Sequence, residues 1–172
     1  FSLGARIEHA QERINRSQYG KFAGHPALGA ADYRLAVHLP NGRGVYTFCM
    51  CPGGEVVAAA SEEGRLVTNG MSRHARDGKN ANAALLVGIL PQDFGSSDVL
   101  AGMELQRRIE EKAFLAGGGG YKAPAQKVGD FLREKRSACL EQIQPTYRPG
   151  VTPGAMEDFL PSYITESMRM GI

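Results

Sequence analysis

The chain has 172 residues and a formal net charge of +2, with 20 basic against 18 acidic side chains. This length suits one domain with a sizeable core, and the near balance of charge disfavours nucleic-acid binding, which usually requires a large basic field. The longest apolar run, 83–90, is far shorter than the ~20 residues of a membrane span, and three cysteines without a secretory leader predict a soluble protein of the reducing cytoplasm.

The first half of the chain has the pattern of short strands. Residues 7–15 are polar and predict a short helix. After a loop rich in Gly and Pro come short runs of β-branched and aromatic residues, separated by turn residues. These predicted strands are 32–39, 44–51, 55–60, 65–70 and 83–90. Their spacing is typical of an antiparallel meander or partial barrel.

The second half of the chain has helical periodicity. Apolar residues recur every three or four positions over 99–116 and 123–135, and the last segment predicts two short helices that meet at Leu160-Pro161. Strands followed by helices predict an α+β fold. We expect one domain, 1–172, with a mainly β part (1–98) and a mainly helical part (99–172).

Two cysteines, Cys49 and Cys51, stand just before the turn Pro52-Gly53-Gly54. On a strand both thiols share one face, because side chains alternate, and Pro followed by Gly is favoured in a type II turn. Free thiols beside a hairpin turn explain this pattern, and so does a thiol at a reaction cleft. A disulfide across one intervening residue would be strained, and no His or Cys stands at ligand spacing, so we expect no metal.

The polar loop from Ser72 to Asn82 is longer than a simple connection requires. Its guanidinium, imidazole and amide groups suit a carboxylate or phosphate ligand, and a solvated loop is the alternative. The candidate binding residues are Arg73, His74, Arg76, Asn80 and Asn82. Arg6, Glu8 and His9 raise the same question, with a solvent-facing helix as the alternative. Gly117 to Gly120 is interpreted as a helix stop, since it lacks the context of a phosphate loop.

The chain begins at Phe1 without Met and has apolar residues at both ends, from which we expect a piece of a longer polypeptide. Seven segments together form a recognisable pattern: "GARIEHAQERIN" (4–15), "LGAADYRL" (28–35), "GRGVYTFCMCPGGEVVAAASEEGRLVTNGMS" (42–72), "RDGKNANAALLVGI" (76–89), "GMELQRRIEEKAF" (102–114), "GGGYKAPAQKVGDFL" (118–132) and "PTYRPGV" (145–151). These segments resemble the inner portion of the bacterial FAD-dependent dehydrogenase family, whose substrates are undefined.

The resemblance implies a Rossmann-type FAD-binding domain in the rest of the same polypeptide, with this region as its substrate-side or cap domain. We then expect an oxidoreductase that is inactive as the isolated piece and binds FAD only in the longer protein. In that setting Cys49 or Cys51 would exchange a proton, and Pro52, Gly53 and Gly54 would approach the flavin ring closely. The arginines of the polar loop would hold an anionic substrate or the phosphates of the cofactor. The competing hypothesis is a non-catalytic module that docks a partner protein through its thiol-bearing face and polar loop.

Overall fold

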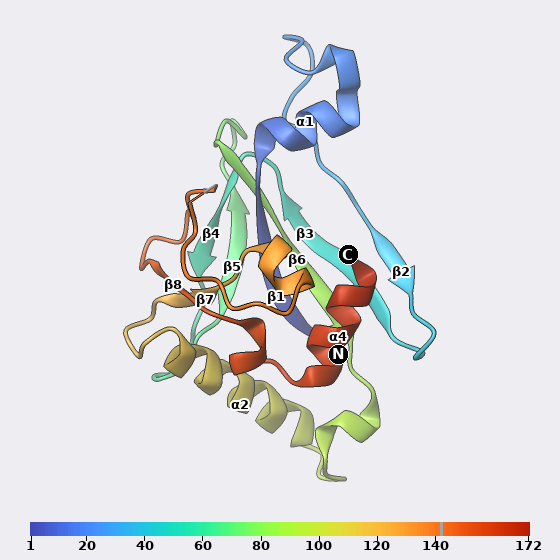
Figure 1. Ribbon diagram of the computed structural model, residues 1–172, viewed down its shortest axis with the longest axis vertical. Helices are drawn as coiled ribbons and strands as arrows, with labels where there is room; N and C mark the ends of the chain where they lie inside the picture. Colours follow the sequence, from blue (N-terminus) through green and yellow to red (C-terminus); the bar gives the residue numbers. More distant parts are fainter. Residues whose placement is uncertain (142) are drawn as a thin grey trace.

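The computed structural model describes residues 1–141 and 143–172, and a four-stranded antiparallel sheet lies at its centre (Figure 1). The strand order is β1-β6-β3-β2, with β1 at Ser2–Ala10, β6 at Asn80–Gly88, β3 at Gly44–Cys51 and β2 at Ala36–His38. β6 is a central strand and has the most buried side chains, which agrees with its apolar run from residue 83 onward. β1 and β2 are therefore the two edges of this sheet.

Two smaller sheets lie beside the main one (Figure 1). β4 (Gly54–Ala58) and β5 (Thr68–Ser72) form an antiparallel hairpin directly after the Pro-Gly-Gly turn. β7 (Ala123–Ala125) and β8 (Val151–Pro153) form a short parallel pair. This pair holds the C-terminal third of the chain together next to α2.

Helices cap the ends of the sheet and cover part of one face (Figure 1). The α-helices are α1 (Gln11–Tyr19), α2 (Ala101–Ala116), α3 (Val128–Leu132) and α4 (Ser162–Gly171), and the 3-10 turns are η1 (Gly20–Phe22), η2 (Pro91–Phe94) and η3 (Met156–Asp158). α2 buries Leu105, Ile109 and Ala113, which lie on one face because they are four residues apart. It ends at Gly117, where an added Cβ would lie 1.8 Å from the carbonyl oxygen of Lys122.

The predicted α+β fold is confirmed, and so is the strand at 44–51. The order of the strands is less simple than a continuous meander, since β6 lies between β1 and β3. The break at Leu160-Pro161 is also confirmed, because η3 ends just before it and α4 begins just after it.

Two helix predictions are wrong in part. The helix predicted at 7–15 begins only at Gln11, and the residues before it belong to β1. Leu3, Ala5 and Ile7 alternate with polar or small residues, and this period of two fits the strand that pairs with β6. The helix predicted at 123–135 is reduced to α3, because 123–125 pair with β8 instead.

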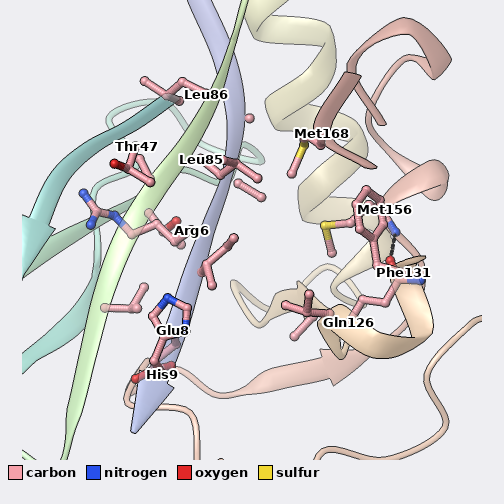
Figure 2. A pocket seen from close by; sticks show the side chains of 18 of the residues that line it. Arg6, Glu8, His9, Thr47, Leu85, Leu86, Gln126, Phe131, Met156 and Met168 are labelled. Carbon is pink, nitrogen blue, oxygen red and sulfur yellow. Dashed lines mark hydrogen bonds between the residues drawn. The ribbon is translucent and has the colours of Figure 1, made fainter. Parts of the chain in front are cut away.

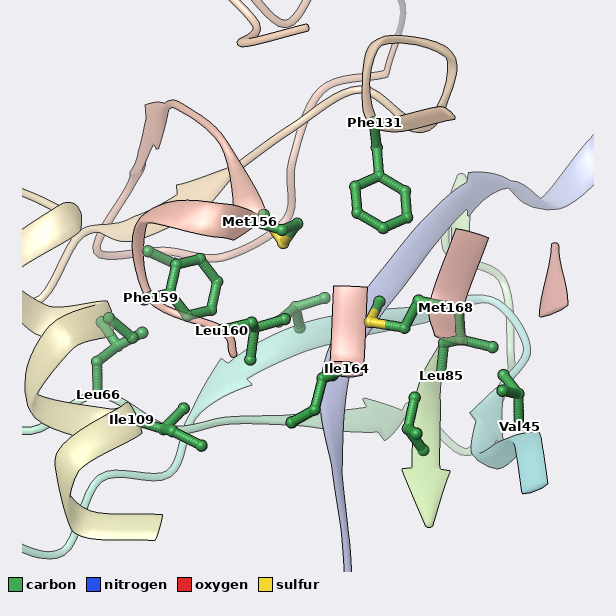
Figure 3. Close-up of a cluster of buried hydrophobic side chains, with 14 of the residues drawn as sticks. Val45, Leu66, Leu85, Ile109, Phe131, Met156, Phe159, Leu160, Ile164 and Met168 are labelled. Atoms are coloured by element: carbon green, nitrogen blue, oxygen red, sulfur yellow. The ribbon is translucent and has the colours of Figure 1, made fainter. Parts of the chain in front are cut away.

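One continuous hydrophobic core joins the sheet to the C-terminal segments (Figure 3). Val45 and Leu85 of the sheet pack with Ile164 and Met168 of α4, and Ile164 is fully buried. Further along, the same core includes Leu66, Ile109, Phe131, Met156, Phe159 and Leu160. The core therefore depends on the last 45 residues as much as on the strands.

A buried ion pair joins Arg43, the residue directly before β3, to Asp93 of η2. The Arg43 guanidinium donates two hydrogen bonds to the Asp93 carboxylate, at 2.7 and 2.8 Å, and one to the carbonyl of Gly88. It also stacks on the ring of Tyr163 at 4.6 Å. Hydrogen bonding from Arg43 is the main reason why the pKa of Asp93 lies below its usual value. Buried charge is thus fully compensated at this position.

Within the described ranges, no helix combines the length and the apolar character that crossing a membrane requires.

Candidate functional site

A cavity of about 1680 Å³ surrounds the free edge of β1 (Figure 2). On one side of β1 its wall is apolar and includes Phe131, Met156 and Met168. On the other side it is lined by Arg6, Cys49, Thr68 and Asn69, among others. We call this cavity the β1 cleft, with an apolar side (Ala5, Ile7, Leu85, Phe131, Met156 and Met168) and a polar side (Arg6, Cys49, Thr68 and Asn69).

The two thiols lie at a β-bulge in β3. The pairing of β3 with β6 shifts register between Phe48 and Cys51, and Cys49 has a φ of 47°. Extra residues in one strand turn the side chains that follow, and here they send the two thiols to different environments. Cys49 is exposed and lines the β1 cleft, whereas Cys51 is buried.

The Cys51 thiol is held as a neutral group. It donates a hydrogen bond to the carbonyl of Cys49 at 3.3 Å. Burial, followed by the neighbouring thiol of Cys49, raises the pKa of Cys51 above its usual value. A thiol with a raised pKa is a poor nucleophile, because the thiolate is the reactive form.

Arg6 lies on the polar side of the cleft, and among the described residues its side chain donates hydrogen bonds only to uncharged acceptors. It donates to the Cys49 carbonyl at 3.1 Å, to Oδ1 of Asn82 at 2.6 Å and to Oδ1 of Asn69 at 3.0 Å. Its Nε is buried and has no hydrogen-bond partner in the described part of the chain. No carboxylate among the described residues forms an ion pair with it, in contrast to the compensated Arg43. A partly buried cation without a counter-ion at a cleft is suited to binding an anionic group.

Glycine at position 70 makes room for this arrangement. An added Cβ there would lie 2.2 Å from Nη1 of Arg6 and 2.2 Å from Oδ1 of Asn82. Gly70 is buried. The hairpin β4-β5 therefore closes over the guanidinium and fixes its position.

His9 and Tyr33 form a second polar pair at the cleft. The His9 Nε2 and the Tyr33 hydroxyl are 2.7 Å apart, and both residues line the cavity. Burial is the main cause that lowers the pKa of His9, and the charge of Arg13 adds to it. Burial likewise raises the pKa of Tyr33. A neutral imidazole beside a phenol is an arrangement that can relay a proton.

Glu8 has a structural position at the end of the cleft. Its carboxylate accepts hydrogen bonds from the backbone N–H and the hydroxyl of Thr146, and from the amide of Asn80. Asn80 is buried and also donates to the carbonyl of Gln144. These contacts fasten the segment around Thr146 to the main sheet.

The Pro52-Gly53-Gly54 turn is buried inside the domain. Gly53 has a φ of 52°, as the second central residue of a type II turn requires, and its N–H donates to Oε1 of Gln11 at 2.7 Å. An added Cβ at Gly53 would lie 2.0 Å from the Arg76 carbonyl oxygen. The space that these glycines leave is thus occupied by the chain itself.

The predicted loop 72–82 is shorter in the structure, because Ser72 ends β5 and residues 80–82 begin β6. None of its candidate residues lines the β1 cleft. Arg73 and His74 are exposed, and Arg73 forms a surface ion pair with Glu55. Arg76 instead borders a smaller cavity of about 330 Å³, together with Gln11 and other residues. Of this set only Asn82 joins the polar side of the cleft, through its hydrogen bond to Arg6.

The structure therefore brings together Cys49, Arg6, Asn69 and Asn82, and separates them from Arg73, His74 and Arg76. Asn69 and Tyr33 were not predicted as site residues, and nothing in their local sequence distinguishes them. Arg6 and His9 were considered from the sequence with a helix as the alternative. The alternation of Leu3, Ala5 and Ile7 with Gly4, Arg6 and Glu8 is the signal of a strand, and it places Arg6 on the face opposite to these apolar residues and His9 on the same face. In the part of the chain that is described, no three His, Cys, Asp or Glu side chains lie together as metal ligands would.

The polar side of the cleft fits one oxygen-rich group and does not fit a dinucleotide diphosphate. Arg6 offers a guanidinium that bonds only to neutral partners, which suits a carboxylate. A diphosphate usually binds to backbone N–H groups where a glycine-rich loop opens a helix. The run Gly117 to Gly120 follows the end of α2 instead.

This geometry defines the class of the protein, which is an α+β domain with an open cleft along an edge strand. A family model described as "FAD-dependent protein, C-terminal domain-like" matches residues 1–172, and the chain belongs to this family. An uncharacterized protein of Clostridium beijerinckii is 55% identical over 173 residues. That match covers 100% of this chain and 32% of the relative, so the chain spans about a third of the length of the curated relative that it matches. The resemblance to FAD-dependent proteins is thereby confirmed at the level of the family.

Proposed function

We propose that residues 1–172 form the substrate-side domain of a cytoplasmic FAD-dependent oxidoreductase of dehydrogenase type. A FAD-binding domain elsewhere in the same polypeptide would complete the enzyme, so the isolated domain is inactive. FAD supplies the electron transfer when it is bound, and the protein orients the substrate and excludes water. The single observation that carries the proposal is the uncompensated Arg6 cation at the β1 cleft of a chain that belongs to a FAD-dependent family.

The chain's own residues have distinct roles in this proposal. Arg6 binds an anionic group of the substrate, and a carboxylate suits its planar guanidinium best. Asn69 and Asn82 hold the guanidinium in place. Cys49, the exposed thiol of the cleft, is the candidate proton donor or acceptor, and the neutral Cys51 supports the bulge.

The His9 and Tyr33 pair is a second candidate for proton transfer. The imidazole is neutral near pH 7 because its pKa lies below the usual value. A neutral imidazole accepts a proton, and the Tyr33 hydroxyl at 2.7 Å provides a route to return it. The binding roles first considered for Arg73, His74 and Arg76 would require a ligand at the surface rather than in the cleft.

The competing function is a non-catalytic module that docks a partner protein. It is favoured by the exposure of Arg73, His74 and Arg76, which are free to face another surface. A partner that bound there would be sensitive to substitutions in this loop and insensitive to substitutions in the β1 cleft.

A carboxylate titration of the flavin tests the proposal. The full-length polypeptide is loaded with FAD, and its absorbance is followed while acetate, oxalate and benzoate are added separately. We expect at least one carboxylate to perturb the flavin spectrum in the wild type, and Arg6→Met to weaken its affinity by about 10-fold or more, as for the loss of a charge-assisted hydrogen bond.

Arg34→Met is the matched control, because Arg34 is exposed and does not line the cleft. It should bind the same carboxylate with unchanged affinity. Equal affinities in the wild type and Arg6→Met would refute the role of Arg6. Loss of carboxylate binding in Arg73→Ala, with binding retained in Arg6→Met, would instead place the anion site in the surface loop.

A further inference from the structure

The outer edge of β1 has no strand beside it in the described sheet, although β1 lines the cleft along its length. The Gln11 N–H bonds to the Lys79 carbonyl, and the Ile89 N–H bonds to the Phe1 carbonyl, at the two ends of the β1-β6 pairing. The backbone groups that face β6 therefore belong to the odd-numbered residues of β1, because hydrogen-bonded pairs alternate along an antiparallel ladder. The backbone groups of Ser2, Gly4, Arg6 and Glu8 therefore point away from the sheet. No hydrogen bond to these groups is present within the described ranges.

Proteins usually protect such an edge with charged side chains, proline or a covering segment. β1 contains no proline, and its two charged side chains do not guard the edge. Arg6 is turned toward Asn82 and Asn69, and Glu8 toward Thr146 and Asn80. β1 is thus an open template for a further strand.

The apolar side of the cleft suits the apolar side chains of such a strand. Ala5 and Ile7 line it from β1 and pack against the core that contains Phe131, Met156 and Met168, which Figure 2 labels. The volume of about 1680 Å³ exceeds the roughly 300–1,000 Å³ of a typical small-molecule site. There is therefore room for a polypeptide segment as well as a small molecule at the polar side.

Both ends of the described chain lie at this cleft. Ser2, near the N-terminus, and Ile172, at the C-terminus, both line the cleft. Figure 1 shows the two termini close together beside β1 and α4. Polypeptide attached at either end starts at the border of the cleft. A segment attached to either end is held in the same molecule, and a short flexible connection would give it an effective concentration of order mM at the cleft.

We propose that an extended segment of the same polypeptide, outside residues 1–172, pairs with the free edge of β1 as a fifth strand. Its side chains alternate, with apolar residues on the face of the sheet that carries the half-buried Ala5 and Ile7. This inference rests on the proposed function in one respect, namely that the chain is one domain of a longer flavoprotein. The match to 32% of the relative's length supports that premise. It names the surface through which the two parts join.

Residue-resolved amide hydrogen exchange on the full-length polypeptide tests the pairing. The opposite edge provides an internal control, because Leu39 N–H and the Leu35 carbonyl bond to β3, which leaves the amides of Ala36 and His38 facing outward. We expect the amides of Arg6 and Glu8 to exchange at least about 10-fold more slowly than those of Ala36 and His38. Exchange of the two pairs within about threefold of each other would overturn the proposal.

A photo-crosslinking residue in place of Ile7 identifies the occupant. Crosslinks to peptides outside 1–172 of the same molecule support the proposal. Crosslinks to a second copy, or protection that is lost on dilution to a monomer, would overturn it in favour of an intermolecular strand. Neither readout depends on the guanidinium of Arg6 or on flavin chemistry, so failure of the proposed function and failure of the strand pairing are distinguishable.

Discussion

The Asp93→Asn substitution should destabilise the domain strongly. The side chains of Arg43 and Asp93 are only 9% and 7% exposed, and their two hydrogen bonds measure 2.7 and 2.8 Å. The neutral amide leaves the Arg43 cation buried without its counter-ion, which costs about 3–5 kcal/mol. Asp93 also accepts from the Leu90 N–H at 2.7 Å, so the turn at η2 loses a charge-assisted bond as well.

Urea unfolding of the 172-residue chain, followed by circular dichroism, measures this loss. With a dependence on urea of about 2 kcal/mol per molar, the midpoint should fall by roughly 1.5–2.5 M. The double variant Arg43→Met with Asp93→Leu should recover much of the stability, because it removes both charges together. A loss below about 1 kcal/mol for Asp93→Asn would refute the reasoning, since that is the value of an exposed pair.

The pH dependence of the same pair has a definite sign. Hydrogen bonding from Arg43 lowers the pKa of Asp93 in the folded chain. Its contribution to stability is therefore complete above the ordinary pKa of 3.8 and is lost as the pH falls through the lower, folded value. The free energy of unfolding of the wild-type chain should therefore lose this contribution in acid. That of Asp93→Asn should lack this part of the pH dependence.

Three further outcomes follow from the same structure. Gly53→Ala should lower the free energy of unfolding by about 2 kcal/mol or more in the same urea assay, because the residue has positive φ and its Cβ would overlap the Arg76 carbonyl; a loss below about 0.5 kcal/mol would contradict the geometry. Cys49 should react with a thiol reagent about 10-fold faster than Cys51, since Cys51 is buried and its pKa is raised; mass spectrometry of the labelled peptide decides the order. His9 should titrate below 6.5 by NMR, because burial lowers its pKa, and a midpoint above 6.5 would contradict its burial beside Tyr33.

The sequence was sufficient to predict the local elements that have a strong period or clear turn residues. The strand at 44–51, the long helix that became α2 and the break at Pro161 follow from alternation, fourfold spacing and proline. The strand β1 was not predicted, because a helix pattern and a strand pattern overlap around Ile7 and only pairing with β6 decides between them. Long-range pairing of this kind is not visible in local periodicity.

The candidate site was less predictable than the fold. The bulge at Cys49 is one residue in size, yet it separates the thiols that simple alternation places on one face. Likewise, Arg6 acquires its role from Asn69 and Asn82, which are 63 and 76 residues away in sequence. Positions that depend on such distant partners require the three-dimensional structure.

The content of FAD in the purified full-length polypeptide tests the central claim most directly. After incubation with FAD and removal of the excess, the account predicts one flavin per polypeptide by absorbance, and none in residues 1–172 alone. A full-length polypeptide that retains no flavin would contradict the assignment of this chain to the substrate side of a flavoenzyme.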